Sequence, residues 1–503
     1  MRFSKKTNPR RDQLHKNMVA DKFLKVCQFI TLDFLMSMLI TISFVVACVL
    51  ILSFEFTDKK SYIQMLPLVV IISEITITIS LYVFNYQKRV IKNHARALAM
   101  SIFFLMLVAI TKFGVLMTDR EAWAIGSAVA ASIILAICYN QRFAISMTIF
   151  FCLIGFLAVG IDASMKVFFA MLAGAVTCGF SLGEIRTRTK MLNVTLVAVF
   201  IVFITSVSLS FLVGTSDKGE IFKNAGYNSA AVFLVGFMVQ GFLPIIEKVF
   251  RVVTSMTLLA YSDANQELLK RLAMEAPGTF SHCLLVGSIS ETAAESIGRN
   301  GLLCRVGAYY HDIGKINKPT YFVENEMGQS NRHKELSPPM SQLIIVGHVK
   351  DGVEMAKEYK LPAVLRQFIE THHGTTLVEY FYNEAKKLQD EKQGQVLESE
   401  FRYPGPKPRT KEAAIVMIAD AVEGAARSLT EITPTKIETV VHNIAMKRLQ
   451  DGQFDECDLN LSELSKIEAA LSKSLAGHYH GRIAYPKRVD EPSWESKSNG
   501  LGQ

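Results

Sequence analysis

Length, composition and charge exclude an ordinary soluble protein. The chain has 503 residues, of which 50% are hydrophobic, and its formal net charge is +8. The long apolar runs lie in the first 250 positions or so, whereas most acids and histidines follow them. This asymmetry predicts a membrane half and a soluble half, the latter long enough to bury one substantial core. Much of the basic excess flanks apolar segments, so the charge does not indicate a partner such as a nucleic-acid polymer.

The eight cysteines include no CxxC pair, and several lie inside apolar stretches. We interpret them as small buried hydrophobic residues in a reducing compartment, and not as disulfides or zinc ligands.

Eight apolar segments are long enough to cross a bilayer, which requires roughly 20 helical residues. Their connections are short, which predicts a compact helical bundle over residues 29–250. The segments are 29–54, 62–84, 97–117, 121–138, 143–161, 165–183, 191–214 and 225–250.

The distribution of Lys and Arg predicts the orientation of these segments. Basic residues gather in the N-terminal stretch 1–28, between Lys88 and Arg96, and between Arg186 and Lys190, all on one side of the bundle. The positive-inside rule therefore places both termini and the soluble half in the cytosol of a multi-pass inner-membrane protein. Glu74 lies in the middle of a segment, where either a functional role or an interhelical hydrogen bond would explain it.

The soluble half is expected to be all-α, because it shows helical periodicity and no convincing strand. Residues 251–278 are expected to form linker helices, which Pro277 and Gly278 end. Residues 279–487 would form one helical domain, within which 386–412 reads as a long polar surface loop. The polar tail, 488–503, is expected to be disordered.

Five histidines and two aspartates stand out because each follows or lies in an apolar helical segment. Asp420 is the clearest case, since its helix is apolar on nearly every face, and a buried carboxylate must be paired or bind a metal. The seven residues are His282, His311, Asp312, His348, His372, His373 and Asp420.

Imidazole and carboxylate groups without thiolates fit iron, manganese or zinc. Seven ligands exceed the needs of one ion, whereas two ions that share one carboxylate would use them all. Such a pair stabilises the attacking and leaving oxygens in phosphate-ester hydrolysis.

The pattern H…HD…H…HH…D resembles the HD superfamily of phosphohydrolases in its dinuclear form. More closely, the chain is similar to the bacterial seven-transmembrane-HD phosphodiesterases, which hydrolyse cyclic di-AMP. The stretches that carry this resemblance are LLAYSDANQELLKRLAMEAPGTFSH, AYYHDIGKINKPTYFVEN, LSPPMSQLIIVGHVKDGVEMA, THHGTTLVEYFYNEA, MIADAVEGAARSL and GHYHGRIAYP.

The resemblance implies a set of roles and two divalent ions, iron or manganese. The first ion would be held by His282, His311, Asp312 and Asp420, and the second by His348, His372 and His373, with Asp312 as the bridge. His311 and Asp312 would also count as catalytic, and Lys315 would meet a substrate phosphate. The implied reaction opens cyclic di-AMP to the linear dinucleotide pApA in second-messenger signalling.

One departure from the family concerns its large extracytoplasmic domain, which would lie between the first and second spans. Only about EFTDKKS is found there. The count of one plus seven spans is kept, but the signal that the bundle would sense is left open, as is a homodimer.

Two alternatives are retained. Cyclic di-GMP phosphodiesterases of the HD-GYP kind continue the HH motif into acidic and GYP residues, whereas this chain reads HHGTTLVEYFY. A non-catalytic cyclic-dinucleotide receptor would be expected to have lost a ligand, and every ligand is present here.

Overall fold

The structure, a computed structural model, describes residues 34–480 except 56–58, 88–93, 161–164, 184–186, 251, 327–331, 393–395 and 430. The chain divides into two compact units, Met1–Met256 and Thr257–Gln503. The described residues confirm the all-α prediction, since they contain no strand and only an isolated bridge between Leu377 and Arg402. The N-terminal stretch 1–28, much of the Lys88–Arg96 cluster and the tail 488–503 lie outside the described residues.

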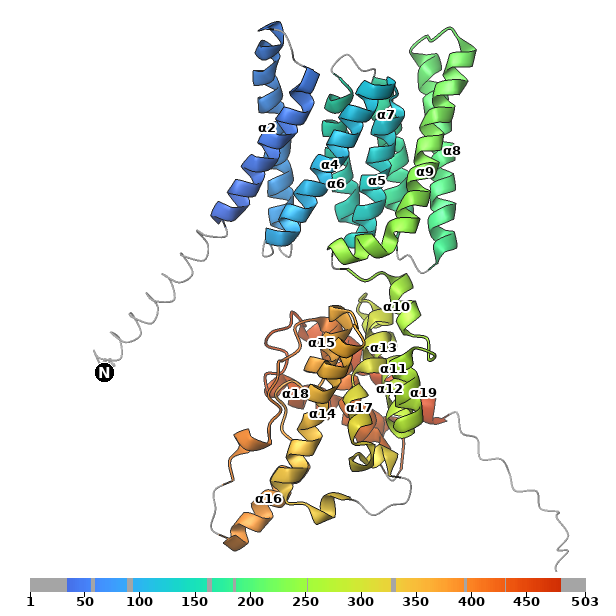
Figure 1. Cartoon of the computed structure of the whole chain (residues 1–503). Helices are drawn as coiled ribbons and strands as arrows, with labels where there is room; N and C mark the ends of the chain where they lie inside the picture. Colours follow the sequence, from blue (N-terminus) through green and yellow to red (C-terminus); the bar gives the residue numbers. More distant parts are fainter. Residues whose placement is uncertain are drawn as a thin grey trace, which may run out of the picture. The chain divides into compact units, whose positions relative to one another are not determined.

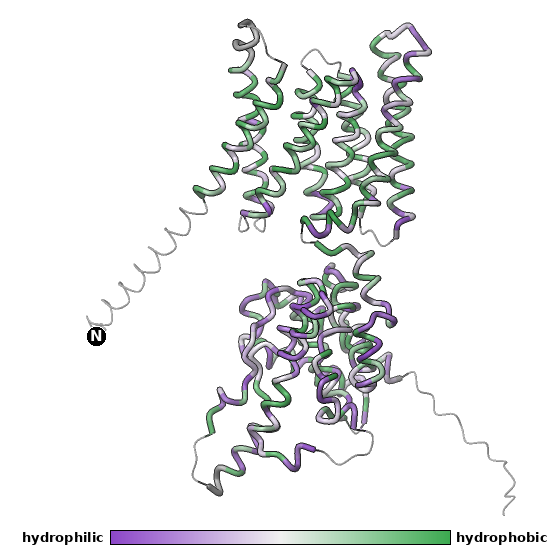
Figure 2. The backbone as a smooth tube through the Cα atoms, in the orientation of Figure 1, coloured by the Kyte–Doolittle hydropathy of each residue, from purple (hydrophilic) through white to green (hydrophobic). Residues whose placement is uncertain are grey.

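The N-terminal unit is a bundle of apolar helices (Figure 1). Its helices are Phe34–Leu52, α2 (Lys59–Tyr86), α4 (His94–Thr118), α5 (Ala122–Cys138), α6 (Gln141–Val159), α7 (Met165–Ser181), α8 (Arg188–Leu212) and α9 (Lys218–Phe250). Hydrophobic residues cover most of this unit, in contrast to the mixed colouring of the C-terminal unit (Figure 2).

Six of these helices are long and apolar enough to cross a membrane, whereas α5 and α7 have 17 residues each and are shorter than predicted. The chain leaves α5 at Tyr139, and the side chain of Asn140 caps the next helix. Helix α5 packs against α4, α6, α7 and α9. Because protein surrounds it, α5 need not present a full bilayer thickness to lipid.

Polar side chains join some helices within the bundle. Ser132 of α5 donates to the carbonyl of Ala175 in α7 at 2.6 Å, and Asn228 of α9 donates to Ser206 of α8 at 3.2 Å. Such bonds are typical of helix association in an apolar medium. Glu74, by contrast, is exposed on the surface of the bundle and makes no interhelical bond with the described residues.

The C-terminal unit surrounds α17, whose central run Ala413–Ala419 is completely buried. Helices α12, α13, α15, α18 and α19 all pack against it. The unit contains α10 (Ser255–Tyr261), α11 (Glu267–Glu275), α12 (Pro277–Ser296), α13 (Gly301–Tyr310), α14 (Pro338–Glu358), α15 (Ala363–Thr371), α16 (Glu379–Lys392), α17 (Lys411–Arg427), α18 (Pro434–Gln450) and α19 (Leu461–His480). Short 3-10 helices lie between some of them, at Ile313–Asn317, Pro319–Tyr321, Val323–Asn325, Arg332–Glu335 and Glu398–Phe401.

The prediction of a long surface loop over 386–412 is wrong in part. Helix α16 continues to Lys392, and the segment that follows returns to the core, where Phe401 and Tyr403 are buried. The backbone N–H groups of Val378 and Tyr403 bond to the carbonyls of Phe401 and Thr376, which fixes this return. Because the segment is polar in composition, the burial of these two aromatic residues was not expected.

A close backbone contact fixes the segment after Asp312. A Cβ atom added to Gly314 would lie 1.8 Å from the carbonyl oxygen of His348, which no real structure tolerates. Only glycine therefore lets this segment approach α14.

We expect Gly314→Ala to lower the Tm of the full-length protein by about 5–10 °C, the effect of a few kcal/mol of overpacking. Thermal unfolding followed by circular dichroism measures it. Gly347→Ala, also on α14 but with open space around the added carbon, is the matched control and should leave the Tm unchanged or raise it slightly. Equal Tm values for the two variants would contradict the assigned contact.

Candidate dinuclear metal site

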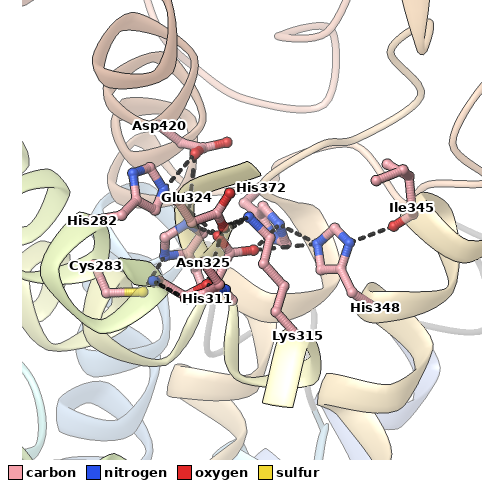
Figure 3. Close-up of polar contacts among 12 residues, drawn as sticks. His282, Cys283, His311, Lys315, Glu324, Asn325, Ile345, His348, His372 and Asp420 are labelled. Atoms are coloured by element: carbon pink, nitrogen blue, oxygen red, sulfur yellow. Dashed lines mark hydrogen bonds and ion pairs between the residues drawn. The ribbon is translucent and has the colours of Figure 1, made fainter. Parts of the chain in front are cut away.

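The structure brings all seven predicted residues together, although they lie in or directly after five separate helices. His282, His311, His348, His372 and Asp420 are labelled in Figure 3. His282 lies in α12, His348 in α14 and Asp420 in α17, while His311 and His372 each cap the C-terminal end of a helix. All seven are buried or nearly so.

Two overlapping groups have ligand atoms within 4.8 Å of one another. The first contains His282, His311, Asp312 and Asp420, and the second contains Asp312, His348, His372 and His373. Asp312 belongs to both groups, as a bridging carboxylate must. The two groups contain the same residues as the two ligand sets implied by the family resemblance.

The two oxygens of Asp312 face different partners. Its Oδ2 lies 3.2 Å from Nε2 of His311 and 3.6 Å from Nε2 of His282. Its Oδ1 lies 3.3 Å from Nε2 of His348 and 3.5 Å from Nε2 of His372. One carboxylate thus divides its two oxygens between the two groups.

Backbone carbonyls orient three of the imidazoles. Nδ1 of His311 lies 2.6 Å from the carbonyl oxygen of Ala308, and Nδ1 of His348 lies 2.5 Å from that of Ile345. In His372 it lies 2.9 Å from the carbonyl of Ile369. A carbonyl accepts only from a protonated Nδ1, so Nε2 is the nitrogen that each ring presents to the cluster. Fixing the tautomer in this way is typical of metal-binding histidines.

Several buried polar atoms in the cluster lack a hydrogen bond. Nε2 of His311 and both oxygens of Asp312 are in this state, although the Lys315 ammonium lies 2.8 Å from Oδ2. Nε2 of His348 and Nε2 of His372 are 3.1 Å apart, yet each is an acceptor when its Nδ1 donates to a carbonyl. A cation between these acceptors would satisfy them together, so the donor set fits metal ions.

The electrostatics of the first group also suit a cation. Burial alone would raise the pKa of Asp420, but the hydrogen bond from His282 and the nearby His311 outweigh it and hold that pKa well below its usual range. Burial lowers the pKa of His282, but its bonds to Asp420 and Glu423 outweigh burial and raise it to about 10. Carboxylates that stabilise the positive charge of a protonated His282 would stabilise a divalent cation by the same attraction.

The second group is different because three imidazoles share one carboxylate. Burial lowers the pKa of His373 well below its usual range, and the neighbouring His372 adds to the effect. Burial also lowers the pKa of His372, so the imidazoles of His372 and His373 are neutral at pH 7, which is the form that binds a metal.

Two further residues support the site and were not predicted from the sequence. Glu423 is 2% exposed, and its Oε2 lies 2.5 Å from Nδ1 of His282. Its place three residues after Asp420 puts it on the same face of α17, which the sequence could have indicated. Tyr403 stacks on His373 with ring centroids 4.2 Å apart. It lies in the segment that was expected to be a surface loop.

Lys315 is close to the cluster but is already paired. Its Nζ lies 2.8 Å from Oδ2 of Asp312 and 2.8 Å from Oε1 of Glu324, and its side chain is 13% exposed. A role for Lys315 toward a substrate phosphate stays a prediction.

Both halves of the chain resemble known proteins. Residues 62–254 match the family model described as a 7TM receptor with intracellular HD hydrolase, and residues 279–425 match the HD domain. The chain thus resembles 7TM-HD proteins in its N-terminal half and HD hydrolases in its C-terminal half. It is therefore a membrane protein with an HD domain in its C-terminal half.

Two curated relatives of this chain are called cyclic-di-AMP phosphodiesterase PgpH. The protein from Bacillus subtilis is 38% identical over 81% of this chain and 58% of its own length. The protein from Listeria monocytogenes is 37% identical over 72% of this chain and 50% of its own length. The chain thus spans only about half of the length of these relatives.

A solved structure also matches. It is the HD domain of L. monocytogenes PgpH in complex with cyclic-di-AMP, which is 46% identical over 43% of this chain and 100% of that chain, with a TM-score of 0.42.

We expect Glu423→Gln to weaken metal binding by about 10–100-fold, because His282 loses the carboxylate that orients its ring. Titration of the metal-free full-length protein with Mn²⁺ measures the affinity. Glu412→Gln, in the first turn of the same helix, is the control and should bind Mn²⁺ like the wild type. Unchanged affinity in Glu423→Gln would show that this contact does not support a ligand.

Proposed function

We propose that the protein is a membrane-anchored phosphodiesterase that hydrolyses cyclic di-AMP to pApA at a dinuclear metal site formed by the seven clustered residues. The observation that carries this proposal is Asp312, whose two oxygens are divided between the two ligand groups. The substrate is inferred from the two PgpH relatives, whose names state it.

Two divalent ions, iron or manganese, would supply Lewis-acid charge for hydrolysis of a phosphodiester. His282, His311, Asp312 and Asp420 would hold one of them. His348, His372 and His373 would hold the other together with Asp312.

The remaining residues of the site orient the metal ligands or contribute charge. Glu423 holds the ring of His282, and the backbone carbonyls of α13, α14 and α15 hold three further rings. Lys315 would bring positive charge to the phosphate, for which it exchanges part of its contact with Glu324. Water adds to phosphorus, one P–O3′ bond breaks, and the released O3′ takes a proton to give a linear dinucleotide with a 5′-phosphate.

The direct test is hydrolysis by the purified full-length protein with Mn²⁺. It should convert cyclic di-AMP to pApA, chelation should abolish turnover, and Asp312→Asn should lower kcat by at least about a thousandfold. His442→Ala, which removes an exposed histidine on α18, is the control and should retain activity. Rapid opening of cyclic di-GMP with no action on cyclic di-AMP would contradict the substrate assignment, and binding without turnover would indicate a receptor.

The same proposal places the protein in the inner membrane with both termini and the HD domain in the cytosol. A fluorescent protein fused after Gln503 should fold and fluoresce, because its fluorophore forms in the cytosol. Alkaline phosphatase inserted after Ser216, between α8 and α9, should be active, because this turn faces outward. The reverse pattern would overturn the orientation.

A further inference from the structure

Arg448, in the last turn of α18, has no partner for its charge among the described residues. Its side chain makes no hydrogen bond or ion pair with them, and its Nε is buried. A guanidinium that has lost part of its hydration without a compensating anion is costly. Such a group is retained where a ligand supplies the anion.

The neighbouring acids are already engaged by other cations. Arg402 binds Asp451 through two nitrogens, at 2.9 and 3.1 Å, and Lys447 pairs with Glu379. Asp451 is only three residues from Arg448 and would otherwise be its natural partner on the helix. The arrangement keeps Arg448 free.

Hydrogen bonds fasten the end of α18 to the segment that follows His372 and His373. The carbonyl of Arg448 accepts from the backbone N–H of Gln453 at 3.0 Å. The side chain of Gln453 then accepts from the N–H of Thr375 and donates to its hydroxyl, both at 2.9 Å. This connection places the end of α18 beside the segment that directly follows His373.

Arg448 lies near the metal-binding cluster without being part of it. Asp420 and Tyr403 both act electrostatically on Arg448 and raise its pKa. Tyr403 in turn stacks on His373. Arg448 nevertheless makes no ion pair with either carboxylate of the cluster. Burial lowers the pKa of Arg448 more than these acidic neighbours raise it, so its positive charge is only partly compensated.

We propose that Arg448 binds the second phosphodiester of the cyclic dinucleotide, the one that is not being hydrolysed. This inference rests on the proposed function. A cyclic dinucleotide carries two anionic phosphodiesters, and the seven-residue cluster can act on only one of them at a time. The planar fork of an arginine matches two oxygens of a phosphate better than a lysine does.

The test compares two substrates in the full-length protein with Mn²⁺. Cyclic di-AMP has two phosphodiesters, whereas bis(p-nitrophenyl) phosphate has one and needs the metal site alone. Arg448→Gln should lower kcat/KM for cyclic di-AMP by about 10–100-fold, mainly through KM, as expected for the loss of a charge-assisted contact. It should leave hydrolysis of bis(p-nitrophenyl) phosphate unchanged, and Arg448→Lys should lie between Arg448→Gln and the wild type on cyclic di-AMP.

Stability separates binding from a structural role. Arg448→Gln removes an unpaired charge, so its Tm should equal or exceed that of the wild type. Lys447→Gln, which removes the adjacent and more exposed cation, is the matched control and should keep kcat/KM for both substrates.

Two results would overturn the inference alone, with the wild type still active on cyclic di-AMP. They are an equal loss on both substrates in Arg448→Gln and an unchanged KM for cyclic di-AMP. A wild-type protein that hydrolyses bis(p-nitrophenyl) phosphate but not cyclic di-AMP would instead overturn the proposed function, and this inference with it.

Discussion

Four imidazoles and one ammonium group lie within 3.6 Å of the two oxygens of Asp312, a carboxylate whose side chain is 1% exposed. A buried anion of this kind is stable only if surrounding charge compensates for lost hydration. Burial would raise the pKa of Asp312, but the charges of His311 and Lys315 outweigh it and keep the pKa well below its usual range. The carboxylate thus stays ionised and can serve both groups of ligands.

The helices around Asp312 are arranged to serve this carboxylate. His311 and His372 follow the last turns of α13 and α15, where free backbone carbonyls accept from their Nδ1 atoms. Helix α17 passes through the centre of the unit and supplies Asp420 and Glu423 from one face. Several acceptor atoms face one another in this core, and bound cations would stabilise that arrangement. Metal binding and folding of this unit are therefore expected to be coupled.

Much of the fold and most of the candidate site could be predicted from the sequence. The apolar segments were long, and the histidines and Asp420 followed apolar helical runs, so their burial was foreseeable. Tyr403 was missed because polar neighbours surround it, and Arg448 was missed because one unpaired charge on a helix leaves no signal. The pairing of Lys315 with Glu324 depends on a turn of short 3-10 helices whose geometry no periodicity reveals.

The spans of the N-terminal bundle were also only partly predictable from the sequence. Segment length predicted eight spans, but α5 and α7 end after 17 residues. Hydropathy measures how apolar a helix is and does not distinguish lipid from protein as its surroundings. Helix α5 contacts four other helices, so its short length is compatible with its position.

The central claim is that Asp312 is shared by two metal ions. Anomalous diffraction at the manganese edge, from crystals of the full-length protein loaded with Mn²⁺, tests it most directly. The account predicts two separate peaks, one beside each oxygen of Asp312, in the wild type. A single peak, or two peaks that do not both adjoin this carboxylate, would contradict it.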